Sequence, residues 1–320
     1  MEVRLFDEFN DLFSIESFLE SRKVSHGHDY YNSKSWFKWK FLNSPSGKAI
    51  MPTVFDKNEI LGANYYGIYP LKRSEKKISG IMPYEIFVHE KCQGKGLFKK
   101  CISLAEAVAK KNKIQIMMAF PNKKSIQGFM SLGWTYIPNS IIYWIKPKWT
   151  FNFMVNILDL KKGFKPVLPK TKNNFSFSPD SNNLYTGQVR GDWNQDYLSW
   201  RFNQLPQAKY IQIKNNSFEI IARLGFRGKL KETQVLYVNF LQTKFERRGF
   251  KKIIKNLAKT TNTDLLSFPM SEHYPIYHEM KNMFFYKLPS RSQFVYKVLD
   301  TNLKNDNLKF SLCGLEFHTY

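Results

Sequence analysis

The sequence predicts an α/β layered fold that is built twice in tandem. Two observations support this prediction: helical and strand-like patterns alternate along the chain, and short motifs of the first half return in the second. The 320 residues suit about two domains of ordinary size, and a composition that is 43% hydrophobic and 16% aromatic can fill a core in each. We expect the boundary near residue 150, which gives domains 1–149 and 150–320.

The duplication rests on three pairs of short segments. The pairs are WKFLNSP at 39–45 and WRFNQLP at 200–206, GLFKKCI at 96–102 and GFKKII at 249–254, and AFPN at 119–122 and SFPM at 267–270. Because the pairs keep their order in each half, we interpret them as the remnants of a duplicated domain. Residues 165–183, rich in Pro, Asn, Ser and Lys, are expected to connect the halves as a loop.

The charge balance restricts the partners. The chain carries 49 Lys and Arg against 26 Asp and Glu, and its net charge of +23 favours anionic partners such as phosphate-bearing substrates. The basic residues are spread along the whole chain, together with many Asn, Ile, Phe and Tyr, and a biased genome composition produces the same pattern. We therefore expect no dedicated nucleic-acid site. Peripheral association with an anionic membrane is compatible with the charge.

The cysteines and the N-terminus indicate the compartment. Cys92, Cys101 and Cys313 are an odd, scattered set that fits neither a disulfide framework nor a metal site, and no histidine pair is completed by acidic residues. No apolar run reaches the roughly 18 residues of a membrane helix, and the N-terminus lacks the basic region of a secretory signal. These features predict a cytoplasmic protein in a reducing compartment, without a metal.

One segment, residues 84–134, is expected to carry the chemistry. The β-rich run EIFV is followed by QGKGLF and then by a helix whose apolar residues recur at helical spacing. A strand that leads through a glycine turn into a helix start presents free backbone N–H groups and a partial positive charge to an anion. Gly94 and Gly96 let a phosphate approach the backbone, and Lys95 and Lys99 add charge nearby. An ordinary strand-to-helix turn is the alternative interpretation.

The whole segment resembles motifs A and B of the GNAT superfamily of N-acetyltransferases. Their signature is a strand, Gln/Arg-x-x-Gly-x-Gly/Ala, a long helix, a second strand, and Asn-x-x-Ala/Ser before a short helix that ends in Gly-Phe/Trp. The matching positions are Gln93, Gly96, Asn122, Ser125, Gly133 and Trp134. GKGLF, FPNKKS and LGW are similar to the two-domain members of surface-polysaccharide biosynthesis. The resemblance implies tandem GNAT-like domains, each with a mixed, mostly antiparallel twisted sheet flanked by helices.

The resemblance also implies an acyl-CoA cosubstrate, acetyl-CoA first of all, between the strands EIFV and IQIMMAF. Backbone N–H groups near Phe87 and Val88 would polarise the thioester carbonyl, and the glycine loop would hold the pyrophosphate. Asn122 would contact the pantetheine arm, and Ser125 would cap the short helix that follows. The expected cofactor-binding residues are Phe87, Val88, Gln93, Gly94, Lys95, Gly96, Leu97, Phe98, Asn122 and Ser125.

Two residues depart from the family pattern. Phe98 stands where many members have Gly or Ala, so its ring could narrow the approach to the pyrophosphate. Phe129 stands where many members carry the tyrosine that protonates the leaving thiolate. The general acid therefore has to come from elsewhere in the chain.

Direct attack by an amine requires a general base. Glu85 is our first candidate, because strand alternation places it on the same face as Phe87. His89 is the second candidate, since an unperturbed histidine titrates near neutral pH. Tyr136 and Tyr143 could supply the missing acid. The structural alternatives are a solvated strand-end carboxylate for Glu85, a loop histidine for His89, and core or surface positions for the tyrosines.

The second half lacks both the Gln-x-x-Gly-x-Gly sequence and the Asn of the later motif. We expect it to have lost the coenzyme and to shape the acceptor site or pack structurally. The predicted function is acyl-CoA-dependent N-acetylation of a primary amine, either an amino sugar or a nucleotide-linked amino sugar. Two alternatives remain: a Fem-type aminoacyltransferase, which the QGKGLF loop disfavours, and a non-catalytic basic binding protein whose SWFKWKF segment stacks on bases.

Overall fold

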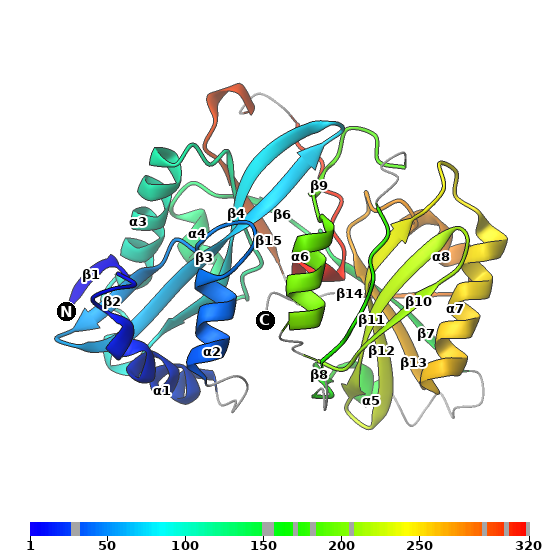
Figure 1. Ribbon diagram of the computed structural model, residues 1–320, viewed down its shortest axis with the longest axis horizontal. Coiled ribbons are helices and arrows are strands. Elements are labelled where there is room, and N and C mark those ends of the chain that lie inside the picture. The colour runs from blue at the N-terminus through cyan, green and yellow to red at the C-terminus, as the bar shows by residue number, and fades with distance from the viewer. Residues whose placement is uncertain are drawn as a thin grey trace. The chain divides into compact units, whose positions relative to one another are not determined.

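The computed structural model describes residues 1–26, 33–148, 157–168, 172–179, 184–204, 208–289, 293–303 and 307–317 (Figure 1). The chain divides into two compact units. The first consists of Met1–Leu71, Lys77–Pro138 and Ser292–Asn307, and the second of Lys72–Lys76, Asn139–Arg291 and Leu308–Tyr320. Each unit holds one mixed sheet flanked by helices, so the predicted α/β layered fold class is confirmed. The expected boundary at residue 150 lies in 149–156, outside the described residues.

The first unit is built on a mostly antiparallel sheet. Its strands follow the order β1 (Glu2–Leu5), β2 (Pro52–Asp56), β3 (Glu59–Arg73), β4 (Lys76–Val88), β5 (Ile116–Ala119), β15 (Phe294–Val298) and β6 (Thr135–Ile137). β4 and β5 pair in parallel, whereas β1 with β2, β2 with β3, β5 with β15 and β6 with β15 pair antiparallel. The helical elements are η1 (Leu12–Ser14), α1 (Ile15–His26), α2 (Lys34–Phe37), η2 (Lys38–Leu42), η3 (Glu90–Cys92), α3 (Leu97–Lys111), α4 (Ile126–Met130) and η6 (Thr301–Leu303).

Different helices cover the two faces of this sheet. Tyr65 and Tyr66 are neighbours on β3 and therefore point to opposite faces. Tyr66 belongs to the same buried cluster as Ile102 of α3. Tyr65 stacks on Phe18 of α1, with ring centroids 5.3 Å apart, and meets Phe41 of η2 edge-on at 5.1 Å. The helix α3 thus covers one face, and α1 with η2 covers the other.

The second unit repeats the plan of the first. Its strands follow the order β10 (Tyr210–Lys214), β11 (Phe218–Arg227), β12 (Leu230–Phe240), β13 (Leu265–Met270), β7 (Ile142–Pro147) and β14 (Tyr286–Pro289), and β8 (Phe164–Pro166) also pairs with β11. Again one pair, β12 with β13, is parallel. The remaining elements are α5 (Ile157–Leu160), β9 (Val189–Gly191), α6 (Gln195–Ser199), η5 (Trp200–Gln204), α7 (Arg247–Thr261), α8 (Tyr277–Asn282) and α9 (Gly314–Phe317).

Both sheets combine strands from the two halves of the chain. Strand β7 precedes the expected boundary, yet it pairs with β13 and β14 in the second sheet. Strand β15 lies near the C-terminus, yet it pairs with β5 and β6 in the first sheet. The predicted connecting loop contains part of β8 and a stretch at 172–179 without helix or strand, whereas residues 169–171 and 180–183 lie outside the described residues.

The W-K-F and W-R-F motifs form the same local structure in both units. In each, a short α-helix passes directly into a π-helix: α2 into η2, and α6 into η5. The side chains of Ser33 and Asn194 cap these helices by accepting from the N–H groups of Trp36 and Tyr197. The aromatic residues of the first motif are buried and so are not available to stack on bases.

Two features of the described residues concern membranes and metals. None of their helices is long and apolar enough to cross a bilayer. None of their His, Cys, Asp and Glu side chains gather in a group of three or more that could hold a metal ion.

Candidate functional site

Strands β4 and β5 diverge at the centre of the first sheet. Their parallel pairing is limited to Gly80 with Ile116 and Ile81 with Met117, although β4 continues to Val88. The other edge of β5 is occupied over its whole length by β15. Within the described part of the chain, the edge of β4 beyond Ile81 is therefore not paired with β5. The two strands therefore separate towards the end of β4.

The loop that follows β4 exposes a series of backbone N–H groups at the start of α3. Gly94 and Gly96 have φ values of +75° and +70°, in the left-handed region that favours glycine. A Cβ atom at either position would meet no heavy atom within 4 Å. Among the described residues, the N–H groups of residues 94–99 have no hydrogen-bond partner, and the first helical bond runs from Lys100 N–H to the Gly96 carbonyl at 3.1 Å. These N–H groups can bind an anion.

The side chain of Phe98 does not cover this loop. Its ring meets the ring of Phe129 edge-on, with centroids 5.4 Å apart, and lies against Gly128 of α4. Phe129 is fully buried and also contacts Trp134 at 4.8 Å. Phe98 and Phe129, the two residues that depart from the family pattern, are thus packed against each other. The Phe129 side chain has no group that could protonate the thiolate.

Gln93 connects the loop to the end of β4. Its side-chain Nε2 donates to the Val88 carbonyl at 3.4 Å. The next N–H group along the strand, that of His89, donates to Leu61 on β3 at 2.8 Å. Because successive N–H groups of a strand point to opposite edges, the N–H of Val88 faces the β5 side, and that of Phe87 faces β3. Of the two expected oxyanion donors, Val88 is the one directed towards β5.

Asn122 organises the turn between β5 and α4. Its Oδ1 accepts from the N–H groups of Lys124 at 2.9 Å and Ser125 at 3.0 Å. Ser125 stands at the N-cap of α4, but the expected capping bond is absent, because its side chain accepts no helix N–H and its hydroxyl instead donates to Asn122 Oδ1 at 3.2 Å. Asn122 is exposed.

Glu85 is held in a buried cluster of charges. Its carboxylate Oε2 lies 3.1 Å from Arg22 Nε of α1 and 3.4 Å from Lys40 Nζ of η2. Both cations also lie over the ring of Trp36, at 4.6 Å and 4.9 Å from its centroid. Glu85 is 7% exposed, so the alternative of a solvated strand-end carboxylate is wrong. Phe87 packs on Phe18 of the same helix α1, and the two β4 residues therefore share a face.

The other catalytic candidates lie in different surroundings. His89 is half-buried, and its Nδ1 accepts from the Lys91 N–H at 3.3 Å at the start of η3. Tyr136 of β6 donates from its hydroxyl to Gln293 Oε1. Tyr143 lies on β7 in the second unit, where the Arg227 guanidinium lies 5.6 Å from its ring centroid. Only His89 and Tyr136 therefore belong to the unit that contains Glu85 and the loop.

Comparisons with known proteins agree on the fold. No family model and no curated protein matches the sequence. The N-myristoyltransferase of Saccharomyces cerevisiae, solved with myristoyl-CoA and inhibitors, aligns over 97% of this chain and 85% of its own, with a TM-score of 0.52 and 14% identity. A GCN5-related N-acetyltransferase from Anabaena variabilis aligns over 93% and 73%, with a TM-score of 0.61 and 9% identity. Another from Kribbella flavida aligns over 93% and 71%, with a TM-score of 0.56 and 9% identity.

The chain has the GNAT fold. The sequence predicted a coenzyme site from a strand, a glycine loop and a helix. In the first unit these are β4, the loop at residues 93–96 and α3. The identities of these structures are low, so the likeness describes the fold, and the chemistry has to be argued from this chain's own residues.

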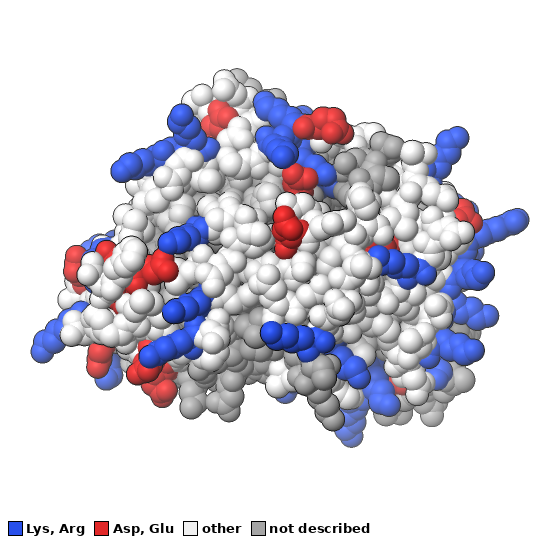
Figure 2. All heavy atoms as spheres, viewed as in Figure 1, with Lys and Arg blue, Asp and Glu red and all other residues white. Residues whose placement is uncertain are grey.

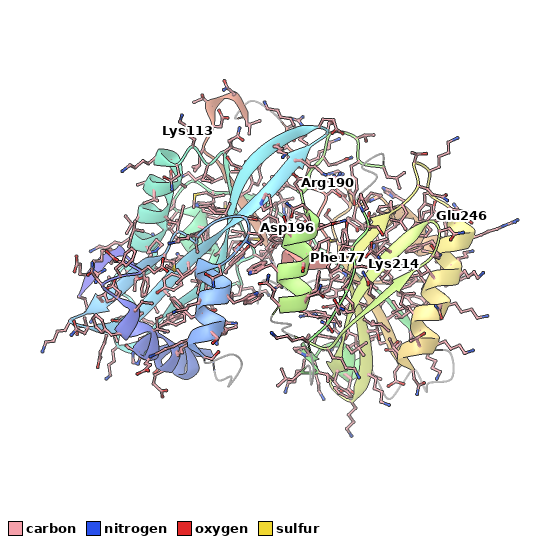
Figure 3. The ribbon with its side chains drawn as sticks, in the orientation of Figure 1. Lys113, Phe177, Arg190, Asp196, Lys214 and Glu246 are labelled. Carbon is pink, nitrogen blue, oxygen red and sulfur yellow. The ribbon has the colours of Figure 1, made fainter. Side chains whose placement is uncertain are left out.

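The second GNAT unit has a different helix start. No residue of 241–249 has a positive φ, and Gly249 lies inside α7. A Cβ on Gly249 would lie 2.5 Å from Glu246 Oε2, so the chain's own carboxylate lies beside the first turn (Figure 3). Ser217 donates to the same oxygen at 2.6 Å. A second anion at this positive helix end would be repelled by Glu246.

Cys101 lies on α3 under the glycine loop and is buried. Burial raises the pKa of its thiol to about 12, so the thiol is not ionised at neutral pH. A thiol in this state is a poor nucleophile. The cysteine therefore serves packing in this unit, beside Leu97 and Val54.

Some residues of the site were not foreseen from the sequence. Arg22 and Lys40, which hold Glu85, come from helices far away in the chain. A signal existed for Lys40, because it is the base of the repeated W-K/R-F motif and stands between two aromatic residues. Gly128 gave no signal, because nothing in its sequence neighbourhood indicates a ring packed on its Cα.

Proposed function

We propose that the protein is an acyl-CoA-dependent N-acyltransferase whose coenzyme site lies in the first unit. The observation that carries the proposal is the start of α3, where the N–H groups of residues 94–99 have no hydrogen-bond partner among the described residues and a Cβ atom on Gly94 or Gly96 would meet no heavy atom within 4 Å. A hydrogen bond to a charged oxygen contributes about 1.5–3 kcal/mol. A micromolar ligand needs about 8 kcal/mol in total. A few such bonds to a diphosphate would supply much of this free energy.

The residues around the loop fit the other parts of a coenzyme A ester. Lys95 and Lys99 are exposed on the loop and the first turn, where they add positive charge for the phosphates. The Gln93 side chain ties this loop to the end of β4. The Oδ1 of Asn122 is occupied by its own turn, and its Nδ2 can donate to an amide carbonyl of the pantetheine arm. Leu97 anchors the helix start in the core.

The acyl transfer then needs a polarised carbonyl and a neutral amine. When bound, the coenzyme ester supplies the acyl group. The N–H of Val88 faces the β5 side of the sheet and donates to the carbonyl oxygen there. Glu85 accepts the proton of the attacking amine, directly or through water, and the neighbouring Arg22 and Lys40 favour its ionised form. The amine attacks directly, since the Cys101 thiol is protonated at neutral pH.

His89 and Tyr136 are the second-choice proton carriers of the first unit. His89 uses Nδ1 within its own turn, which leaves Nε2 to exchange a proton. Tyr136 already donates to Gln293 and would have to exchange this bond for one with the leaving thiolate. Tyr143, which belongs to the second unit, stays a candidate acid.

We further propose that the transferred group is acetyl and that the acceptor is a primary amine of a small molecule, an amino sugar or a nucleotide-linked amino sugar. The net charge of +23 supports an acceptor that carries a diphosphate. The similarity of GKGLF, FPNKKS and LGW to two-domain enzymes of surface-polysaccharide biosynthesis supports the amino sugar.

The test is thiol release from acetyl-CoA by the full chain, against a panel of simple amines, nucleotide-linked amino sugars and peptides. The proposal predicts thiol release with at least one amino sugar, together with an acetylated product of matching mass. Binding of acetyl-CoA without release on any amine would contradict the acceptor class. An absence of both binding and release, with transfer from aminoacyl-tRNA instead, would contradict the coenzyme assignment itself.

A further inference from the structure

The exposed side of α7 carries a stripe of cations. The stripe consists of Arg248, Lys251, Lys252, Lys255 and Lys259, all of them exposed. Their spacing of three and four residues places them on one side of the helix, about 16 Å from end to end at 1.5 Å per residue. The opposite side packs Phe250, Ile253, Ile254 and Leu257 into the second core. Figure 2 shows Lys and Arg gathered along the edge that α7 forms in Figure 1.

Within the described chain, no carboxylate forms an ion pair with a cation of this stripe. Glu279 of α8 pairs with Arg247 beside the stripe at 2.7 Å, and its charge also acts on Lys251. The counterpart helix α3 differs, because its Glu106 binds Lys110 at 2.9 Å and Lys297 at 2.7 Å. Like charges three and four residues apart destabilise a helix. The stripe therefore does not stabilise α7. An anionic partner outside the chain would reduce the repulsion between its cations.

An exposed aromatic corner borders the stripe. Phe284 is 71% exposed and has a φ of +62°, a left-handed conformation that is strained for a bulky residue. Tyr286 nearby is 55% exposed. Lys146 connects the corner to α7: its Nζ donates to the Met283 carbonyl at 2.9 Å. Burial lowers the pKa of the Lys146 amine, and the charge of Lys251 on α7 lowers it further.

We propose that the α7 stripe, together with Phe284 and Tyr286, docks on the surface of an anionic phospholipid bilayer. Such a surface offers a plane of phosphates for the cations and an apolar layer directly beneath, into which an aromatic side chain can enter. A single-stranded nucleic acid fits less well, because it needs a groove in which aromatic rings stack on successive bases, whereas these cations lie on the convex outside of one helix. The proposal does not depend on acyl transfer.

The test is co-sedimentation of the full chain with vesicles of equal parts phosphatidylcholine and phosphatidylglycerol, and with pure phosphatidylcholine vesicles. We expect binding to the anionic vesicles alone, weakened by added salt. A lysine near an anionic surface contributes about 1 kcal/mol, which is about fivefold in partitioning. Lys251→Gln/Lys255→Gln should therefore lower the partition coefficient about 25-fold. Phe284→Ser should lower it without changing the salt dependence.

A matched control is Lys100→Gln/Lys111→Gln on α3, which removes the same charge from an exposed helix of the first unit and should leave binding within about twofold. Circular dichroism melts establish that each variant is folded, and Lys252→Gln/Lys259→Gln provides a second pair on the stripe. Equal binding to both vesicle types, or equal losses for the α3 and α7 pairs, would overturn the proposal. So would tighter binding to random-sequence RNA that the α7 pair abolishes.

Discussion

The ring of Phe98 fills the space in which a side chain on Gly128 would stand. A Cβ atom on Gly128 would lie 2.5 Å from Phe98 Cε1, closer than real atoms approach. This contact joins the first turn of α3 to α4 and turns the ring away from the N–H groups of the glycine loop. A residue that looked like an obstacle to phosphate binding is thereby part of the support of the loop.

The contact predicts a double-mutant cycle. Gly128→Ala forces the Phe98 ring to move and should destabilise the protein by about 1–3 kcal/mol, as overpacking does. Phe98→Ala should also destabilise it, because the contacts with Phe129 are lost. The double variant should lose less free energy of unfolding than the two single variants lose together. Urea denaturation of all four proteins measures this difference. Simple additivity would show that the two residues are not coupled.

Glu85→Gln tests the proposed base. The substitution should lower turnover mainly at low pH, where the acceptor amine is protonated and needs a base. It also leaves Arg22 and Lys40 without their carboxylate, so stability should fall by about 3–5 kcal/mol. The measurement is the pH profile of kcat/KM at a temperature at which the variant is folded. Glu59→Gln, at the exposed start of β3, is the control. A profile that matches the unmodified protein would remove Glu85 from the mechanism.

Glu246 predicts a single coenzyme site in each chain. Since its carboxylate lies beside the first turn of α7, calorimetric titration should give one acetyl-CoA per chain. Glu246→Gln removes a charge that favours the helix start, so stability should fall by about 0.3–1 kcal/mol. The stoichiometry should not change, because α7 also lacks a loop with left-handed glycines. Two equivalent sites in the unmodified protein would contradict this account of the second unit.

Glu316 predicts how stability depends on pH. Burial raises the pKa of its carboxyl from 4.5 to about 8, so the folded protein keeps a proton that the unfolded chain releases within this window. Its stabilising contribution is complete below the unfolded pKa and is lost as the pH rises towards 8. The slope is about 1.4 kcal/mol per pH unit. Glu316→Gln should flatten the dependence, measured by urea denaturation at both ends of the window, whereas Glu272→Gln at the surface should not. An unchanged slope in the first variant would refute the buried neutral carboxyl.

The sequence predicted local features better than distant ones. The turn from β4 into α3 depends on Gly94, Gly96 and the apolar stripe beginning at Leu97, all within one short segment, and so could be predicted. The W-K/R-F repeat could be found in the sequence for the same reason, and both copies form a short helix. Their passage into π-helices was not foreseen, because helical periodicity alone does not distinguish the two hydrogen-bonding patterns.

Contacts between residues that are far apart in the chain could not be predicted from the sequence patterns. Periodicity identifies β7 and β15 as strands but does not indicate that each joins the sheet of the other half. The ion pairs of Glu85 with Arg22 and Lys40 depend on the packing of α1 and η2 against β4. Ser125 occupies the N-cap position, but its hydroxyl bonds to Asn122 Oδ1 in place of a helix N–H, a choice that the spacing of the motif does not reveal.

The mixed origin of the strands in each sheet also limits experiments on the separate halves of the chain. Residues 150–320 by themselves would lack β7, which stands between β13 and β14 in the second sheet. A separated half would therefore expose the edges of two strands. Experiments on either unit are better done with substitutions in the full chain.

The most direct test of the coenzyme site is calorimetric titration of the full chain with acetyl-CoA, comparing Gly96→Val with Gly133→Val. Both glycines have a positive φ and open space at Cβ, so both substitutions impose a similar backbone strain. Only Gly96 lies in the loop that exposes the N–H groups. We predict that Gly96→Val abolishes binding while Gly133→Val keeps it. Unchanged affinity in a folded Gly96→Val variant would contradict the central claim.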